Sequence, residues 1–155
     1  MDTWTQQIGF PLISIKRDGN EIIATQERFI LTTETLNNSN KSTLKSKFGY
    51  KWYVPLTYIT ELDRKSVNHI WMNMTDGKLF KSVFTFINCT IHLVRFEIAP
   101  EVKWIKANVN QSGFYRVMYD DKMWIEIIST LRTNHTLFNP ADRANLIDDV
   151  FTLSR

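Results

Sequence analysis

The chain has 155 residues, of which 43% are hydrophobic and 13% aromatic, so it holds enough apolar material for a folded core and does not have the composition of a disordered protein. Its formal net charge is +3, and basic and acidic residues are interspersed along the sequence. Because a nucleic-acid-binding surface needs clustered lysine and arginine, no nucleic-acid partner is expected. The single cysteine, Cys89, excludes an internal disulfide.

The first thirty residues predict the end of a helix followed by a hairpin. Residues 1–8 are expected to form the last turn or two of a helix, because Gly9 can end it and Pro11 prevents its continuation. Two strand-like segments follow at residues 12–16 and 21–31. The Asp-Gly pair between them is typical of a two-residue hairpin turn.

The middle of the chain predicts further short strands. Residues 32–47 are mostly Thr, Ser, Asn and Lys, which is typical of a long exposed loop. Strands are expected at residues 52–59 and 68–74, and Pro55 places the first of these at a sheet edge because proline cannot donate to the ladder. Short strands separated by turns, with no helix between them, predict an antiparallel β-sandwich over residues 10–119.

The sandwich is expected to end in two strands joined by a polar bend. Residues 104–107 form the first of these strands and residues 114–119 the second. One face of the second strand carries Tyr115, Val117 and Tyr119. Asp120 then has the character of a helix N-cap, so the chain is expected to change from strand to helix at this residue.

Two amphipathic helices are predicted within residues 120–155, as the beginning of a helical domain. The apolar stripe of the first consists of Met123, Trp124, Ile127, Ile128 and Leu131. In the second, Asn139 is predicted to cap the helix, Pro140 to take its first position, and Asp142 to lie near the positive end of its dipole. The expected buried face of this second helix consists of Ala144, Ile147, Val150 and Phe151.

Residues capable of catalysis are few and poorly spaced for it. A zinc hydrolase typically carries His-Glu-x-x-His on one helix, and this sequence has no such spacing. Cys89 has no neighbouring histidine and is interpreted as an inert thiol. Asp148 and Asp149 point about 100° apart on a helix, so they are interpreted as a polar face that contacts a neighbouring domain. We expect no catalytic, cofactor-binding or metal-binding residue here, and a structural or merely exposed role for His69, His92 and His135.

Six Asn-x-Ser/Thr sequons occur where about two would be expected by chance, which indicates passage through a secretory pathway. Glycans are expected at Asn37, Asn40, Asn73 and Asn134. The N-terminal residues lack the basic and apolar regions of a signal peptide, so a piece of a larger chain is expected. The most apolar window, residues 79–99, contains several charged side chains and cannot cross a membrane.

Three motifs together resemble the M1 family of zinc aminopeptidases. They are MDTWTQQIGFPL at residues 1–12, the pair WIKAN and GFYRVMYD within residues 104–120, and DRANLIDDVFTLSR at residues 142–155. In that family they resemble the end of the catalytic domain, the end of the β-sandwich domain and the opening of the C-terminal helical domain. The pattern is most similar to the branch of membrane-anchored ectoenzymes that contains glutamyl aminopeptidase and aminopeptidase N.

The resemblance divides the chain into three parts. Residues 1–9 would be the end of a helix of the upstream catalytic domain, residues 10–119 the β-sandwich connector domain, and residues 120–155 the beginning of the C-terminal helical domain. Residues 79–96 have no recognised counterpart in the family. They are interpreted as an inserted hairpin or as unspliced intron sequence in a gene model.

The resemblance implies a parent enzyme that removes N-terminal residues from peptides with one zinc ion. Its zinc ligands and catalytic residues would lie upstream of Met1, so none is assigned to this chain. The partners implied are the zinc domain and the helical lid domain of the same parent, with peptides as the parent's substrates. The resemblance also implies a single-pass anchor upstream and the extracellular face of the plasma membrane, and it allows a homodimeric parent.

A second hypothesis, from a different class, is a self-standing extracellular β-sandwich module for binding or adhesion. It predicts that the two helices pack back on the sheet, whereas the connector hypothesis predicts apolar helix faces that await a partner. A reading frame that encodes His-Glu-x-x-His upstream would distinguish the two.

Overall fold

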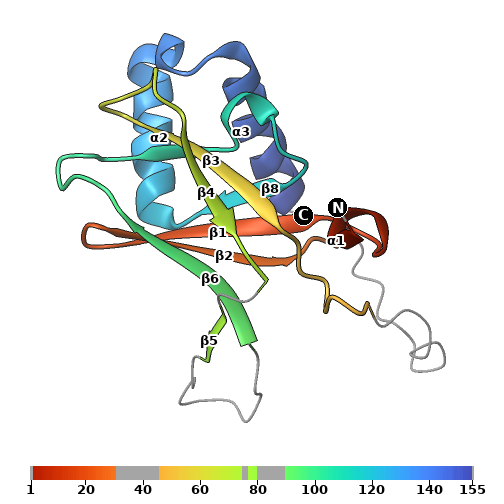
Figure 1. Ribbon diagram of the computed structural model, residues 1–155. Helices are drawn as coiled ribbons and strands as arrows, with labels where there is room; N and C mark the ends of the chain where they lie inside the picture. The colour runs from red at the N-terminus through yellow and green to blue at the C-terminus, as the bar shows by residue number, and fades with distance from the viewer. Residues whose placement is uncertain (1, 31–45, 75–76, 80–89, 155) are drawn as a thin grey trace.

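The computed structural model describes residues 2–30, 46–74, 77–79 and 90–154. The predicted class, a β-sandwich followed by helices, is confirmed, and α2 and α3 lie together on one side of the strands (Figure 1). In chain order the elements are α1 (Asp2–Thr5), β1 (Pro11–Asp18), β2 (Glu21–Arg28), β3 (Val54–Thr60), β4 (Asn68–Met72), β5 (Gly77–Leu79), β6 (Thr90–Glu97), β7 (Ile105–Ala107), the 3-10 helix η1 (Val109–Gln111), β8 (Arg116–Tyr119), α2 (Asp121–Asn134), the 3-10 helix η2 (His135–Leu137) and α3 (Pro140–Leu153).

The strands form two sheets, with the orders β5-β6-β2-β1-β8 and β4-β3-β7. The predicted hairpin is confirmed, since β1 and β2 pair antiparallel along their full lengths. On its other side β1 pairs in parallel with β8, so that Leu12 lies opposite Arg116 and Ile15 opposite Tyr119. Among the described strands every other pairing is antiparallel, and this parallel pair brings the strand before the helices alongside the start of the chain.

Pro55 lies in β3, and the prediction that this strand is at a sheet edge is wrong, because β3 runs between β4 and β7. However, β7 pairs only with Tyr58–Thr60, whereas Pro55 lies opposite Trp71 of β4. At the proline the sheet is therefore only two strands wide. This is the edge-like setting that a residue without an N–H tolerates.

One hydrophobic core lies between the two sheets. Its members on β1, β2 and β3 are Ile13, Ile15, Ile22, Ala24, Val54, Leu56 and Tyr58. Gln26 of β2 is also buried, and its side-chain amide donates to the Trp52 carbonyl oxygen at 3.0 Å and accepts from the Trp52 N–H at 2.9 Å. This buried amide is satisfied at both ends, and it fixes the segment that leads into β3.

Helix α1 is shorter than predicted, since it ends at Thr5 rather than residue 8. The side chain of Gln7 accounts for the early end, because its Nε2 donates both to the Thr3 carbonyl oxygen at 2.8 Å and to the Lys51 carbonyl oxygen at 2.7 Å. These bonds satisfy a helix carbonyl and tie the chain to the segment before β3. Gly9 follows with a φ of 99°, a conformation that favours glycine.

The segment for which the family resemblance offered no counterpart, residues 79–96, begins at the last residue of β5 and includes nearly all of β6. The two strands pair antiparallel, with Gly77 opposite His92 and Leu79 opposite Thr90, as the two arms of a hairpin do. The interpretation of residues 79–96 as an insertion stays a prediction. Three residues discussed above lie outside the described ones: Asn37, Asn40 and Cys89.

Asp120 is the N-cap of α2, as predicted. Its Oδ1 accepts from the N–H of Met123 at 2.8 Å, which caps the helix, and its Oδ2 accepts from the N–H of Arg17 at 2.7 Å. Its own N–H donates to the Ile15 carbonyl oxygen at 3.0 Å. One residue thus continues the pairing of β8 with β1 and starts the helix. Of the predicted stripe, Met123 and Ile127 are buried, Trp124 and Leu131 are half-buried, and Ile128 is exposed.

Candidate functional site: a buried polar junction

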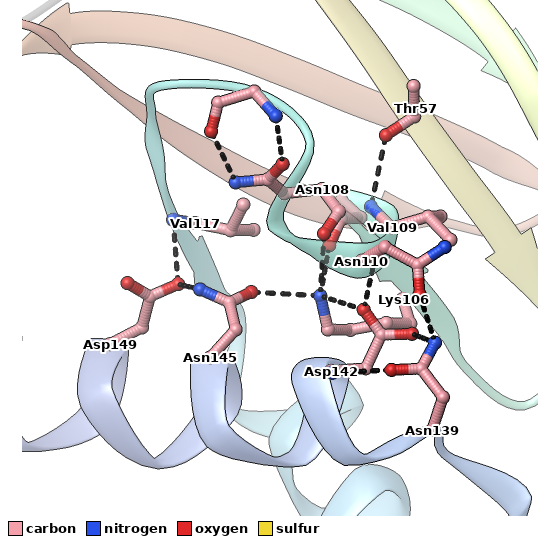
Figure 2. A network of polar contacts seen from close by, with 12 residues as sticks. Thr57, Lys106, Asn108, Val109, Asn110, Val117, Asn139, Asp142, Asn145 and Asp149 are labelled. Carbon is pink, nitrogen blue, oxygen red and sulfur yellow. Dashed lines mark hydrogen bonds and ion pairs between the residues drawn. The ribbon is translucent and has the colours of Figure 1, made fainter.

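Lys106 lies at the centre of a polar cluster between the sandwich and α3. All three residues of β7 are buried, and the Lys106 side chain has no exposed surface. Its Nζ donates to the carbonyl oxygens of Ala107 and Asn108, the latter at 3.2 Å, and to Asn145 Oδ1 at 2.9 Å. The carboxylate of Asp142 lies 3.3 Å away. We call this cluster the polar junction (Figure 2); it consists of Lys106, Asn108, Asp142, Asn145 and Asp149.

Asp142 joins α3 to the bend that precedes β8. Its backbone N–H donates to Oδ1 of the N-cap residue Asn139 at 2.8 Å, which confirms the predicted cap. Its Oδ1 accepts from the N–H of Asn110 at 2.8 Å, and its Oδ2 accepts from Asn139 Nδ2 at 2.6 Å. With Lys106 as the cation, both oxygens of this fully buried carboxylate have partners, which a buried charge requires.

The backbone of the bend is strained. Positive φ values occur at Asn108 (54°), Asn110 (57°) and Gln111 (53°). A left-handed conformation costs a residue other than glycine roughly 1–2 kcal/mol, so surrounding contacts must hold the bend in place. One such contact comes from the sandwich, where the N–H of Val109 donates to Thr57 Oγ1 at 3.0 Å.

The side chain of Asn108 supplies further contacts that hold the bend. Its Nδ2 donates to the carbonyl oxygens of Gly113 at 3.0 Å and Tyr115 at 2.9 Å, and its Oδ1 accepts from the N–H of Gly113 at 2.9 Å. The Tyr115 hydroxyl accepts from the N–H of Thr57 at 3.2 Å and donates to the Pro55 carbonyl oxygen at 3.3 Å. The bend is therefore fastened to β3 as well as to α3.

Asp149 fastens α3 to β8. Its Oδ2 accepts from the N–H of Val117 at 3.2 Å and from Asn145 Nδ2 at 3.0 Å, while its Oδ1 accepts from Arg116 Nη1 at 2.8 Å. Asp148 accepts from the same Arg116 Nη1 at 2.7 Å. The two neighbouring carboxylates thus share one guanidinium, because Arg116 reaches across from β8. The interpretation of a polar face against the next unit fits the buried Asp149, whereas Asp148 is mostly exposed.

Burial shifts the pKa values of Lys106 and Asp149 so that the uncharged form of each side chain is favoured. It lowers the pKa of Lys106, although Asp142 and Asp149 favour the ammonium. It raises the pKa of Asp149, although Arg116 and the N–H of Val117 oppose the rise. Groups with shifted pKa values are common at catalytic sites, but the Lys106 side chain has no exposed surface and its Nζ is surrounded by acceptors. The chemistry of the junction is therefore that of a structural joint.

The face of α3 that packs on the sandwich is polar, and the prediction of its buried face is wrong. The buried residues are Asp142, Asn145, Leu146 and Asp149. The predicted residues are exposed instead, with Ile147 at 56% and Phe151 at 69%. The reason is that the sandwich presents two cations and two backbone N–H groups here, and an apolar helix face would leave them buried without acceptors.

Two signals in the sequence pointed to this arrangement and were missed. Asp142, Asn145 and Asp149 recur at i, i+3 and i+7, which is a helical stripe as regular as the apolar one. Lys106 stands inside the apolar strand Trp104-Ile-Lys-Ala. A lysine at such a position needs a buried acceptor, and the polar helix stripe supplies it.

The packing of α2 and α3 agrees in part with the connector hypothesis and in part with the binding-module hypothesis. They pack back on the sandwich, as the binding-module hypothesis predicts, since Met123, Ile127 and Leu146 belong to its core. They also keep an exposed apolar surface, as the connector hypothesis predicts. Its members are Ile125, Ile128, Ile147, Val150 and Phe151.

The histidines are dispersed, with His69 in β4, His92 in β6 and His135 in η2. Among the residues that the structure describes, no group of three or more His, Cys, Asp or Glu could hold a metal ion. These residues do not fit the zinc ion that the family resemblance implies, so no catalytic step is derived from them. Across the same residues, no helix combines the length and apolar character needed to span a bilayer.

Two of the predicted glycosylation sites can be located. Asn73, just after β4, and Asn134, the last residue of α2, are both exposed. Asn110 is also exposed, but its Oδ1 accepts from Asn139 Nδ2 at 2.7 Å and is thus engaged in holding the helix cap. Glycosylation at Asn37, Asn40, Asn73 and Asn134 stays a prediction.

The fold and the junction define a β-sandwich that is fixed to the first helices of an α-helical unit. Comparison with known proteins identifies the family. Residues 104–155, from the last strands of the sandwich to α3, match the family model described as ERAP1-like C-terminal domain. The chain belongs to the M1 aminopeptidases, and the resemblance indicated by the sequence motifs is confirmed.

Three relatives illustrate the similarity. The chain is 35% identical to endoplasmic reticulum aminopeptidase 2 of Bos taurus over 99% of its length, and 34% identical to glutamyl aminopeptidase of Bos taurus over 100%. It is 31% identical to the thyrotropin-releasing hormone-degrading ectoenzyme of Rattus norvegicus, again over 100%. The chain spans only 13–14% of the length of these relatives, so it corresponds to one segment of an aminopeptidase.

Proposed function

We propose that this chain is the non-catalytic connector of a zinc aminopeptidase, which links a catalytic domain upstream to a helical lid domain downstream. The polar junction is the observation that carries the proposal. It fastens α3 to β7, β8 and the bend between them through Lys106, Asp142 and Asp149. Because α3 is fixed to the sandwich, the sandwich determines how a domain that follows α3 is oriented. The proposal includes the division at residues 1–9, 10–119 and 120–155.

The places where the chain enters and leaves the sandwich support a linking role. Phe10, just before β1, and Asp148, in the second half of α3, line the same cleft of about 280 Å³. Domains attached before Phe10 and after α3 would therefore be neighbours, as a catalytic domain and its lid must be.

The exposed apolar face of α3 supports a helical partner downstream. Ile147, Val150 and Phe151 follow each other at helical spacing and point away from the sandwich. Further helices of the same domain would cover them, because the apolar faces of helices in a helical domain pack against neighbouring helices. The match of residues 104–155 to a C-terminal domain family fits this reading.

The parent is proposed to be a secretory-pathway enzyme that removes N-terminal residues from peptides with one zinc ion. The relatives' names include an endoplasmic reticulum aminopeptidase and an ectoenzyme, and proteins of both kinds enter that pathway. The six sequons agree with this location. A single-pass anchor upstream, the outer face of the plasma membrane and a homodimeric parent are further parts of the proposal.

The connector role is tested in the full-length parent by Asp142→Ala, with Asp121→Ala as the matched control. Asp142 is buried in the junction, whereas Asp121 lies exposed in the first turn of α2. Asp142→Ala is expected to keep the bound zinc but to lower both the melting temperature and peptide turnover, while Asp121→Ala leaves all three unchanged. Wild-type turnover and melting temperature in Asp142→Ala would contradict the connector role.

Two simpler experiments test the non-catalytic role of the chain and the presence of a catalytic domain upstream. The 155-residue chain alone, supplied with zinc and an aminoacyl chromogenic substrate, is expected to give no turnover above a control without protein; turnover would contradict its non-catalytic role. The reading frame upstream is expected to encode His-Glu-x-x-His. Its absence over several hundred residues would favour the binding module, which the packing of the helices on the sandwich also allows.

A further inference from the structure

Trp71 presents a large aromatic surface on the outside of the three-stranded sheet. Its side chain is 61% exposed although it lies inside the paired strand β4. Its partner across the ladder is Pro55, and Tyr53, just before β3, is 44% exposed. An exposed apolar surface of this kind often marks a place that another group covers.

Asn73 lies two residues after Trp71 and is exposed. Between them, Met72 points into the core, with 2% of its surface exposed. Because side chains alternate along an extended chain, Trp71 and Asn73 both point away from the core, roughly 7 Å apart along the chain. In the sequence Asn73 begins the sequon Asn-Met-Thr, whose last residue is Thr75.

We propose that the N-glycan of Asn73 packs on Trp71, so that its first N-acetylglucosamine covers the indole face. The proposal rests on the secretory location of the parent stated above. In the modification itself the donor is a lipid diphosphate-linked oligosaccharide. Its C1–O bond to the diphosphate breaks, a bond forms between C1 and Asn73 Nδ2, Nδ2 loses one proton, and the lipid diphosphate leaves.

The chemistry of the two groups favours this occupant. One face of a pyranose ring carries several C–H groups, and the face of an indole carries the negative part of its quadrupole, so the two attract each other as they exclude water. A sugar attached two residues away on the same side is held beside the ring by the covalent link. No separate partner needs to be recruited.

The second exposed sequon provides a contrast within the same chain. Asn134 has Arg132, not an aromatic residue, two positions before it. It also lies at the end of a helix, where residues two apart do not share a face. A glycan on Asn134 would therefore extend into solvent, so this site serves as the matched control.

The test is hydroxyl-radical footprinting of the full-length parent expressed in eukaryotic cells, with oxidation of Trp71 read by mass spectrometry. Glycopeptide analysis is expected to find a glycan on Asn73. Asn73→Gln and Thr75→Ala remove this glycan in two different ways, and both are expected to increase the oxidation of Trp71 several-fold. Asn134→Gln is expected to leave it unchanged.

Two outcomes would overturn the proposal. The first is an Asn73 without a glycan in a parent that carries glycans elsewhere. The second is a glycan on Asn73 whose loss leaves the oxidation of Trp71 unchanged, which would mean that another domain covers the indole or that it stays open to solvent. Neither outcome touches the connector role, because that role is read from the Asp142→Ala variant.

Discussion

Lys106 and Asp142 form an ion pair of 3.3 Å in which neither side chain has any exposed surface. Lys106 belongs to the last strands of the sandwich and Asp142 to the first turn of α3, so the pair spans the boundary between the two units. A buried ion pair is not necessarily more stable than an apolar contact of the same size. Each of these charges, however, offsets the cost of burying the other. Together they determine which face of α3 packs on the sandwich.

Lys106→Met is expected to lower the free energy of unfolding of the chain by about 3–5 kcal/mol, because it leaves Asp142 buried without its cation. The measurement is urea unfolding followed by circular dichroism. Lys103→Met is the matched control, since Lys103 is exposed three residues earlier in the chain, and a change within about 0.5 kcal/mol is expected. Equal effects of the two variants would show that the buried pair has no special role.

Tyr119→Phe is expected to destabilise the chain at neutral pH and to weaken the decline of its stability above pH 10. The Tyr119 hydroxyl accepts from the N–H of Ala107 at 2.9 Å, so its removal leaves that buried N–H unpaired and costs about 1–3 kcal/mol at pH 7. Burial raises the pKa of Tyr119 above its ordinary value of 10.0. The folded state therefore keeps a proton that the unfolded state loses, and wild-type stability declines as the pH rises above 10.

The free energy of unfolding, measured from neutral pH to above pH 10, is thus expected to fall less steeply for Tyr119→Phe than for the wild type. Some decline remains, because burial also raises the pKa values of Tyr115 and Tyr58. Tyr53→Phe, at a largely exposed site, is the control and should follow the wild-type curve. Parallel curves for Tyr119→Phe and the wild type would refute a proton held by Tyr119 in the folded state.

Gly113→Ala is expected to destabilise the chain by about 1–3 kcal/mol through overpacking. A Cβ at this position would lie 2.1 Å from Cε1 of Tyr115. The ring cannot easily move away, because its hydroxyl bonds both Thr57 and Pro55. The glycine of the Gly-Phe-Tyr motif is therefore required by a close approach within the bend.

The measurement for Gly113→Ala combines urea unfolding with near-UV circular dichroism, which reports the environment of the aromatic side chains, Tyr115 among them. The exposed neighbour Ser112 supplies the control, and Ser112→Ala should leave both signals close to the wild type. If Gly113→Ala keeps wild-type stability and an unchanged aromatic spectrum, the close approach is not a limit on this position.

The features that could be predicted from the sequence depend on residues within a few positions of each other. The Asp-Gly turn, the Asp120 cap and the Asn139-Pro140 start of α3 are local, and the structure confirms all three. The alternation of Tyr115, Val117 and Tyr119 is also local, and these three side chains are buried as expected. Such signals need no knowledge of what lies across the fold.

The features that could not be predicted depend on partners far away in the chain. Pro55 indicated an edge strand, but β7, about fifty residues later, pairs with the other end of β3. Ile147, Val150 and Phe151 indicated a buried apolar face, but Lys106 and Arg116 determine that the polar face turns inward. In both cases a local preference was overridden by a group that the local sequence does not contain.

The last turn of α3 is expected to be its least stable part in the isolated chain. Asp142 and Asp149 hold the helix to the sandwich, whereas the side chains of Val150 and Phe151 lie exposed beyond them. Amide hydrogen exchange of a monomeric sample should therefore be slow in the first two turns and fast in the last. Uniformly slow exchange through Phe151 would show that α3 needs no further partner, and it would favour the self-standing module.

Asp149→Ala tests whether the polar junction determines how the rate of amide exchange varies along α3. It removes the acceptor of the Val117 N–H, so fast exchange is expected to spread from the last turn of α3 toward Asp142. Asp148→Ala is the matched control, because the exposed Asp148 shares only the Arg116 guanidinium and a surface ion pair contributes about 0–1 kcal/mol. If both variants exchange like the wild type, α3 is held by Leu146 and its apolar neighbours alone, and the polar junction does not hold the helix in place.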